Sequence, residues 1–94
     1  MKSPTFEWDK NKNKENIKKH VVSFEYAQYA FGDPLRVIAI DHKHSTSREK
    51  RYFCYGLLAG DIVTVRFTWR NGKIRILGAG FYREGRGIYY EKNK

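Results

Sequence analysis

The sequence contains a single cysteine and no long apolar run, and each absence excludes a class of protein. Cys54 is the single cysteine among its 94 residues, so no internal disulfide can form. We therefore expect a reducing compartment, the cytoplasm. No stretch approaches the ~20 apolar residues that a membrane-spanning helix needs. The amino terminus also lacks the apolar core of a secretion signal, so we do not expect secretion.

The sequence also lacks the residue spacings that mark common catalytic sites. Cysteine and histidine do not recur at zinc-site intervals, no glycine-rich loop is placed to hold phosphates, and no serine lies in a nucleophile elbow. We therefore expect no metal ion and no cofactor. Acidic residues are scarce too, with 10 against 19 lysines and arginines and a formal net charge of +9. In one small domain, residues 1–94, this excess indicates a polyanionic partner: nucleic acid, an acidic protein or an anionic membrane surface.

Turn signals divide residues 51–77 into three short runs rich in aromatic and β-branched residues. Asn71-Gly72 favours a two-residue turn, because both central positions of a type I′ turn need positive φ. A turn at Ala59-Gly60 separates the first two runs. The pattern predicts an antiparallel meander. The two turns set the expected pairs: Arg51 with Thr68, Phe53 with Arg66, Cys54 with Val65, Tyr55 with Thr64, Thr68 with Arg75, Trp69 with Ile74, Phe67 with Ile76 and Arg66 with Leu77.

Alternation along these strands sorts their side chains onto two faces. The apolar face must be covered by other parts of the chain, and it carries Tyr52, Cys54, Val63, Val65, Phe67, Trp69, Ile74 and Ile76. The second face mixes cations with aromatics: Arg51, Phe53, Tyr55, Thr64, Arg66, Thr68, Arg70, Lys73, Arg75 and Leu77. Like charges gathered on a sheet repel each other. Either an anionic ligand binds this face, or the arginines are solvated with their stems over the aromatics, and the pattern leaves both interpretations open.

A cationic helix is predicted before the meander, with Asp9 as its N-cap and residues 10–19 as its body. Only Ile17 and, one turn later, Val21 give it an apolar side. We therefore expect it to dock through that narrow stripe. We expect His20, at its end, to be structural and packed against Trp8.

Shorter elements complete the predicted α+β fold. Ser23 is placed to cap a second helix, with Val22 and Ala27 as a hydrophobic staple, and residues 32–34 end it. An edge strand or extended lead-in is expected at 5–8, a strand at 35–40, a polar loop at 41–50 and a frayed helix within 81–91.

Short, unusual motifs are spread along the chain, and together they resemble one family. They are Phe6-Glu7-Trp8-Asp9, Asn16, Lys19-His20, Val22-Ser23-Phe24, the Asp41, His44-Ser45 and Arg51 spacing, and Ile74-Arg75-Ile76 before a tyrosine-ended tail. This set resembles the BrnT toxins over nearly the whole chain. The resemblance implies a RelE-like fold, with a small antiparallel sheet of about four strands, two N-terminal helices and a short C-terminal helix.

The resemblance also implies an activity and a partner. It implies a metal-independent endoribonuclease that inhibits translation as the toxin of a type II toxin–antitoxin pair. The implied partners are an RNA substrate and a BrnA-type antitoxin, in a heterotetramer, with no membrane. One departure stands out: Gly80 replaces an arginine of the family pattern, which implies weakened activity unless Arg83 and Arg86 supply charge from the next turn.

Candidate site residues follow from the second face and the tail. Arg51 and Arg75 flank Thr68, and Arg83 leaves the last strand beside them, so these three arginines are the expected phosphate site. His44 is the expected proton-transfer group, because histidine titrates near neutral pH; a loop histidine bound to Asp41 or Ser45 is the alternative. Further RNA contacts are expected from Arg66, Tyr55, Phe53, Tyr82, Arg86 and Lys73.

Three hypotheses of different classes remain open from the sequence. The first is an endoribonuclease toxin. The second is an RNA- or DNA-binding module without catalysis, and the loss of arginine at Gly80 favours it. The third is an interaction protein whose cationic face holds an acidic antitoxin segment.

Overall fold

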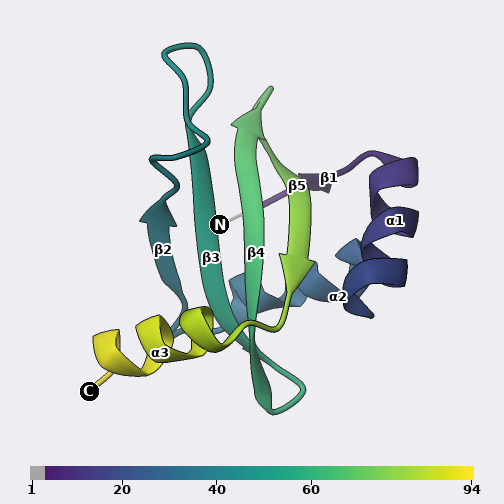
Figure 1. Cartoon of the computed structure of the whole chain (residues 1–94). Helices are drawn as coiled ribbons and strands as arrows, with labels where there is room; N and C mark the ends of the chain where they lie inside the picture. Colours follow the sequence, from purple (N-terminus) through teal and green to yellow (C-terminus); the bar gives the residue numbers. More distant parts are fainter. Residues whose placement is uncertain (1–3) are drawn as a thin grey trace.

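A computed structural model describes residues 4–94 and shows an α+β fold built on one five-stranded sheet (Figure 1). The strands lie in the order β1-β5-β4-β3-β2. Their bounds are Phe6–Glu7 (β1), Val37–Ile40 (β2), Arg51–Leu58 (β3), Asp61–Arg70 (β4) and Lys73–Gly80 (β5). The helical elements are Lys10–His20 (α1), Phe24–Ala27 (α2), Gln28–Gly32 (η1) and Arg83–Lys92 (α3). The predicted class and the packing of helices on a small sheet are confirmed.

The sheet is mixed, whereas the sequence predicted an antiparallel one. The lead-in at Phe6 and Glu7 pairs in parallel with Ile74 and Arg75, and so adds an edge strand beside β5. The other three strand pairs are antiparallel. None of the helices formed by residues 4–94 is long and apolar enough to span a membrane.

Both predicted turns are confirmed by their backbone angles. Asn71 and Gly72 have φ values of 54° and 73°, and Ala59 and Gly60 have values of 52° and 84°. The strand pairs expected from these turns are present, with one exception. The local chemistry of two dipeptides therefore sets most of the sheet register.

The exception is a β-bulge in β5, and it corrects the predicted pairing of Arg66 with Leu77. Phe67 pairs with Ile76, but Arg66 pairs with Gly78, so Leu77 is an extra residue. A Cβ atom on Gly78 would lie 2.9 Å from Nε of Arg66 and 3.0 Å from its Cζ. The bulge thus brings a residue without a side chain opposite Arg66, and the guanidinium lies over the β5 backbone.

The apolar face of the sheet carries the main core, and α2 and η1 cover it from behind in Figure 1. Cys54 is fully buried in this core, as predicted, and burial raises the pKa of its thiol to about 12. Trp69 corrects the prediction of a core tryptophan, because its side chain is 53% exposed. It lies near the β4–β5 turn, beyond the part of the sheet that α2 and η1 cover.

Helix α1 docks through asparagines, which corrects the predicted apolar stripe. Ile17 and Val21 are exposed, whereas Asn13 and Asn16 are buried. The Asn16 amide donates to the carbonyls of Val22 and Ala79 at 2.9 Å, and its oxygen accepts from the Ala79 amide at 3.2 Å. Asn16 therefore joins α1 directly to the β5 backbone, because its amide matches the hydrogen-bonding groups of an extended chain.

Asn13 makes the second link between α1 and the rest of the fold. Its oxygen accepts from the Phe24 amide at 2.8 Å, and its nitrogen donates to the Glu25 carboxylate at 2.7 Å. The predicted caps Asp9 and Ser23 are confirmed, since each accepts hydrogen bonds from the first turn of its helix. Side-chain to backbone bonds thus hold the start of α1, the start of α2 and, through Asn16, the connection between them.

We expect Val21→Gly to raise the free energy of unfolding. Val21 ends α1 at φ 63° with its side chain 88% exposed, so a β-branched residue occupies a left-handed conformation without a packing gain. Left-handed backbone costs an L-residue roughly 1–2 kcal/mol, and part of this is offset by the greater chain entropy of glycine, leaving about 1 kcal/mol. Urea unfolding measures the change, with Val21→Ala as the control that keeps a Cβ. If Val21→Gly is less stable than the parent, the backbone of Val21 is not strained.

Helix α3 crosses the second face of the sheet near the β3–β4 turn (Figure 1). The sequence predicted a frayed helix here because of its glycines, but α3 runs without a break from Arg83 to Lys92. Gly85 explains the close packing, since a Cβ at this position would collide with the Thr64 hydroxyl and lie 3.0 Å from the Tyr55 ring. The second face is therefore covered at this end and open at the other.

Asp33 connects α3 to the rest of the fold. Its carboxylate accepts from the Tyr89 hydroxyl at 2.6 Å, the Leu57 amide at 2.8 Å and the Leu35 amide at 2.9 Å. Burial acts to raise the pKa of Asp33, but these hydrogen bonds outweigh it and lower that pKa. Tyr89 donates a hydrogen bond to Asp33, and this bond raises the pKa of Tyr89 to about 12.

We expect Asp33→Asn to lower the free energy of unfolding by about 1–3 kcal/mol at pH 7, because charged hydrogen bonds are lost. A carboxylate whose pKa is lowered by folding stabilises the protein above its unfolded pKa and loses this contribution as the pH falls through the folded pKa. The gap between parent and variant should therefore close in acid. Urea unfolding at several pH values measures it, with Tyr89→Phe removing one bond alone. If the difference in free energy of unfolding between parent and variant stays the same at every pH, the ionised carboxylate is not its cause.

Candidate active site

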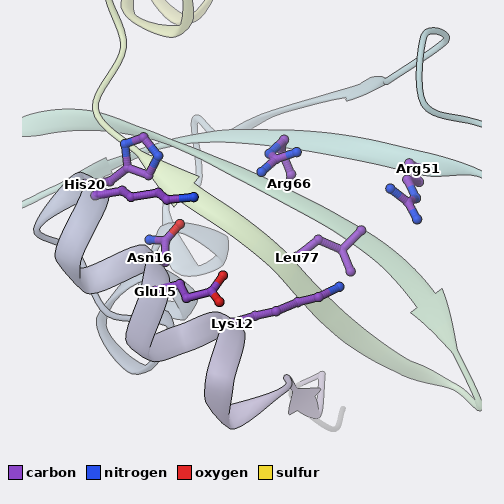
Figure 2. Close-up of a pocket in the computed structure, with 8 residues that line it drawn as sticks. Lys12, Glu15, Asn16, His20, Arg51, Arg66 and Leu77 are labelled. Atoms are coloured by element: carbon purple, nitrogen blue, oxygen red, sulfur yellow. The ribbon is translucent and has the colours of Figure 1, made fainter.

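A cavity of about 300 Å³ lies between α1 and the open part of the second face (Figure 2). Helix α1 supplies one wall, and β3, β4 and β5 supply the other. The lining side chains are Lys12, Glu15, Asn16, Lys19, His20, Arg51, Arg66 and Leu77. The Asn16 bonds to β5 hold the two walls together, so the cavity is a fixed feature of the fold.

Positive charge in this cavity is poorly compensated. Lys12, Lys19, Arg51 and Arg66 line it, against the single carboxylate of Glu15. Arg51 meets Glu49 only at 3.6 Å, with its side chain 37% exposed. Within residues 4–94, neither Arg66 nor the two lysines form an ion pair. Cations that converge on a cavity without matching carboxylates favour an anionic ligand.

His20 stands at one end of the cavity, against Tyr82. The ring centroids are 5.6 Å apart at an angle of 66°, and the Tyr82 hydroxyl lies 3.3 Å from each ring nitrogen of His20. This placement corrects the predicted contact with Trp8, whose ring packs on Phe24 instead. Trp8 precedes α1 and His20 ends it, so a helix of 11 residues, roughly 16 Å long, lies between the two residues.

Gly80 makes room for this aromatic contact. A Cβ at Gly80 would lie 2.7 Å from Cε2 and 2.8 Å from Cζ of Tyr82. The tyrosine ring therefore occupies the space into which a side chain at position 80 would project. The glycines of the Gly78-Ala79-Gly80 segment thus admit two groups, the Arg66 guanidinium and the Tyr82 ring.

A smaller cleft of about 140 Å³ adjoins the cavity, and Arg66 lines both. Its other lining residues are Phe53, Tyr55, Thr64, Tyr82, Glu84 and Gly85. Phe53 and Tyr55 are stacked with their centroids 5.7 Å apart. Burial raises the pKa of Tyr55, and the nearby carboxylates of Glu84 and Asp41 raise it further. The cleft therefore combines aromatic walls with one carboxylate and one guanidinium.

The predicted site residues fall into two groups in the structure. Arg51 and Arg66 line the cavity, and Phe53, Tyr55 and Tyr82 line the cleft. Arg75 lies outside both, because it forms an ion pair with Glu7 at 2.9 Å, across the β1–β5 pair. The row of Arg51, Thr68 and Arg75 is present as predicted, but Thr68 is buried and donates to the Lys50 carbonyl at 2.7 Å.

The remaining predicted residues lie away from the cavity. His44 binds Asp41 at 2.8 Å in the loop before β3, which is the alternative that the sequence left open. Arg86 pairs with Asp61 at 3.3 Å. Arg83 at the start of α3 and Lys73 beside the β4–β5 turn are exposed and line neither space.

Sequence reasoning did not assign the α1 wall of the cavity. The polar residues of this wall are spaced three or four positions apart, so they lie along one side of the helix: Lys12, Glu15, Asn16, Lys19 and His20. The signal was available as helical spacing of polar residues, but such a stripe is more often a solvated face. Within residues 4–94, no group of three or more histidine, cysteine, aspartate or glutamate side chains is placed to hold a metal ion.

Comparison with models of protein families matches residues 8–83 to the family described as ribonuclease toxin, BrnT, of type II toxin–antitoxin system. The matched segment contains α1, every strand of the sheet except β1, and the first residue of α3. It therefore includes every residue that lines the cavity. A search of curated proteins gives no match to this chain.

Proposed function

Because the chain belongs to the BrnT family of ribonuclease toxins of type II toxin–antitoxin systems, we propose that it cleaves RNA internally, without a metal ion, in the cavity between α1 and the sheet. The observation that supports this site is the convergence of His20 with Arg51 and Arg66 in one space. The arginines are suited to bind a phosphate, and the imidazole is suited to move a proton near neutral pH.

The proposed reaction uses the RNA's own 2′-hydroxyl as the nucleophile. The 2′-oxygen forms a bond to phosphorus as its proton passes to a base, and the bond from phosphorus to the 5′-oxygen breaks as that oxygen gains a proton. The products are a 2′,3′-cyclic phosphate and a 5′-hydroxyl. Arg51 and Arg66 stabilise the charge that develops on the phosphoryl oxygens. His20 transfers a proton, and Tyr82 orients its ring.

One base next to the scissile phosphate is proposed to bind the aromatic cleft. Phe53 and Tyr82 present rings next to Arg66, and stacking of a base on such a ring contributes ~1–3 kcal/mol. Gly80 does not leave this region uncharged, because Arg66 lies over Gly78 beside it. We therefore propose that Arg66 supplies the charge that the family arginine would bring, so that the toxin is active.

The antitoxin is proposed to be of the BrnA type and to act in the cytoplasm by covering the same cavity. The net charge of +9 and the excess of cations over carboxylates in the cavity lining suit an acidic segment of the partner. Such a complex, assembled as a heterotetramer, should form faster at low salt. An antitoxin that leaves Arg51 and Arg66 open to solvent would exclude this mode of inhibition.

The test is incubation of the purified protein with single-stranded RNA, with and without EDTA. We expect cleavage in both samples, and the ends should be 2′,3′-cyclic phosphate and 5′-hydroxyl. Loss of cleavage in EDTA, restored by a divalent ion, would refute the metal-independent mechanism. Salt-dependent binding without any cutting would instead favour the alternative of a non-catalytic RNA-binding module.

A further inference from the structure

The cleft beside the cavity has the composition of a nucleobase site, and the side chains of Glu84, Arg66 and Thr64 in its lining form no hydrogen bonds among residues 4–94. Its volume of about 140 Å³ is well below the ~300–1,000 Å³ of sites for drug-sized ligands, so it suits a single flat ring system. Phe53 and Tyr82 provide ring faces for stacking. Arg66 lines both spaces, so a base in the cleft lies next to a phosphate in the cavity.

Glu84 brings a carboxylate to the lining of the cleft. Its carboxylate lines the cleft and forms no ion pair or side-chain hydrogen bond among residues 4–94. An ionised carboxylate is an acceptor only, with two oxygens side by side. The Watson–Crick edge of guanine presents two adjacent donors, the N1–H and the N2 amino group. Adenine, cytosine and uracil each place an acceptor beside a donor on that edge, so they match a carboxylate less well.

Thr64 is another polar residue in the lining of the same cleft. Its hydroxyl is buried and has no hydrogen-bond partner among residues 4–94. Buried hydroxyl groups nearly always have a partner. Gly85 packs directly on this hydroxyl, which places the first turn of α3, and with it Glu84, at the wall of the cleft.

We propose that this cleft binds a guanine base of the RNA substrate, with Glu84 accepting hydrogen bonds from its N1–H and N2 amino groups. This inference rests on the proposed function, because it assigns base preference to the site beside the scissile phosphate. Glu84 also lies in the first turn of α3, where a carboxylate favours the helix dipole. A purely structural role of that kind would affect stability but would not distinguish one base from another.

The test compares binding of four 2′-O-methyl RNA tetranucleotides that differ at one position, measured by fluorescence anisotropy with the intact protein. These probes lack the nucleophilic hydroxyl, so binding is separated from cleavage. We expect the guanine probe to bind about tenfold more tightly than the adenine probe. Glu84→Gln should reduce this preference to less than about threefold and leave the affinity for the other probes nearly unchanged.

Glu91→Gln is the matched control, because it removes the same charge from the same helix at a residue that lines neither space. It should keep the guanine preference. Equal binding of all four probes, or a preference that Glu84→Gln leaves intact, would overturn the guanine site. If the preference is present but RNA is not cut, the proposed nuclease function fails while the base site stands. Cleavage mapped to positions without any base bias counts against the guanine site alone.

Discussion

Arg66→Lys should lower the rate of RNA cleavage by about a hundredfold or more without unfolding the protein. The guanidinium lies over Gly78 at the junction of the cavity and the cleft, where it faces any phosphate bound there. Lysine keeps the charge but lacks the planar fork that binds two phosphoryl oxygens. Loss of one fixed donor to a developing oxyanion typically costs ~10²–10³ in rate. Single-turnover cleavage of a short RNA measures the effect, and thermal unfolding confirms the fold.

Matched arginine variants separate this effect from a general loss of charge. Arg70→Lys changes an exposed arginine that pairs with Glu49 at 2.8 Å outside the cavity, and it should cleave at the parent rate. Arg66→Ala should lose affinity too and reduce the slope of binding against salt by about one. If Arg66→Lys cuts at the parent rate while Arg75→Lys does not, the active site lies at the Arg51–Arg75 row that the sequence predicted.

The parts of the fold that follow from local chemistry were predictable. Asn71-Gly72 and Ala59-Gly60 take positive φ in short turns, and these turns set the register of β3 on β4 and that of β4 on β5 as far as the bulge at Leu77. The register then placed Arg51 opposite Thr68 and Cys54 in the core. These predictions succeed because a two-residue turn leaves a hairpin almost no choice of pairing.

The bulge at Leu77 and the position of α1 were not predictable by the same logic. The bulge brings Gly78 opposite Arg66, and this contact joins residues of two strands that are 12 positions apart in the sequence. Helix α1 has so few apolar residues that its own periodicity does not determine which side faces the sheet. Its docking depends instead on the bonds of Asn16 to residues 22 and 79, which are distant in sequence.

The candidate site was therefore half predicted. The sheet side, with Arg51, Arg66 and the aromatics, followed from the alternation of side chains along the strands. The α1 side, with His20, did not, because its role depends on how a helix packs on that sheet. The prediction for Trp69 failed for a related reason: alternation assigned it to the apolar face, but no element among residues 4–94 covers it.

His20→Gln should lower the cleavage rate by ~10²–10⁴, which is the range for loss of a general acid or base. The substitution keeps a polar side chain of similar size, so the fold and RNA affinity should change little. The dependence of the rate on pH should also lose one limb, because glutamine does not titrate. Tyr82→Phe should have a smaller effect, since the aromatic contact stays and only the hydroxyl beside the His20 ring is lost.

His44→Gln is the control that decides between the two histidines. His44 lies in the 41–50 loop, bound to Asp41 at 2.8 Å and outside the cavity lining. Its replacement should leave both the rate and the shape of the pH profile unchanged. Rates measured between pH 5 and 9 under single-turnover conditions report the chemical step rather than product release. If His44→Gln removes a limb and His20→Gln does not, proton transfer occurs at the loop before β3. The sheet arginines would then act with the histidine that the sequence favoured.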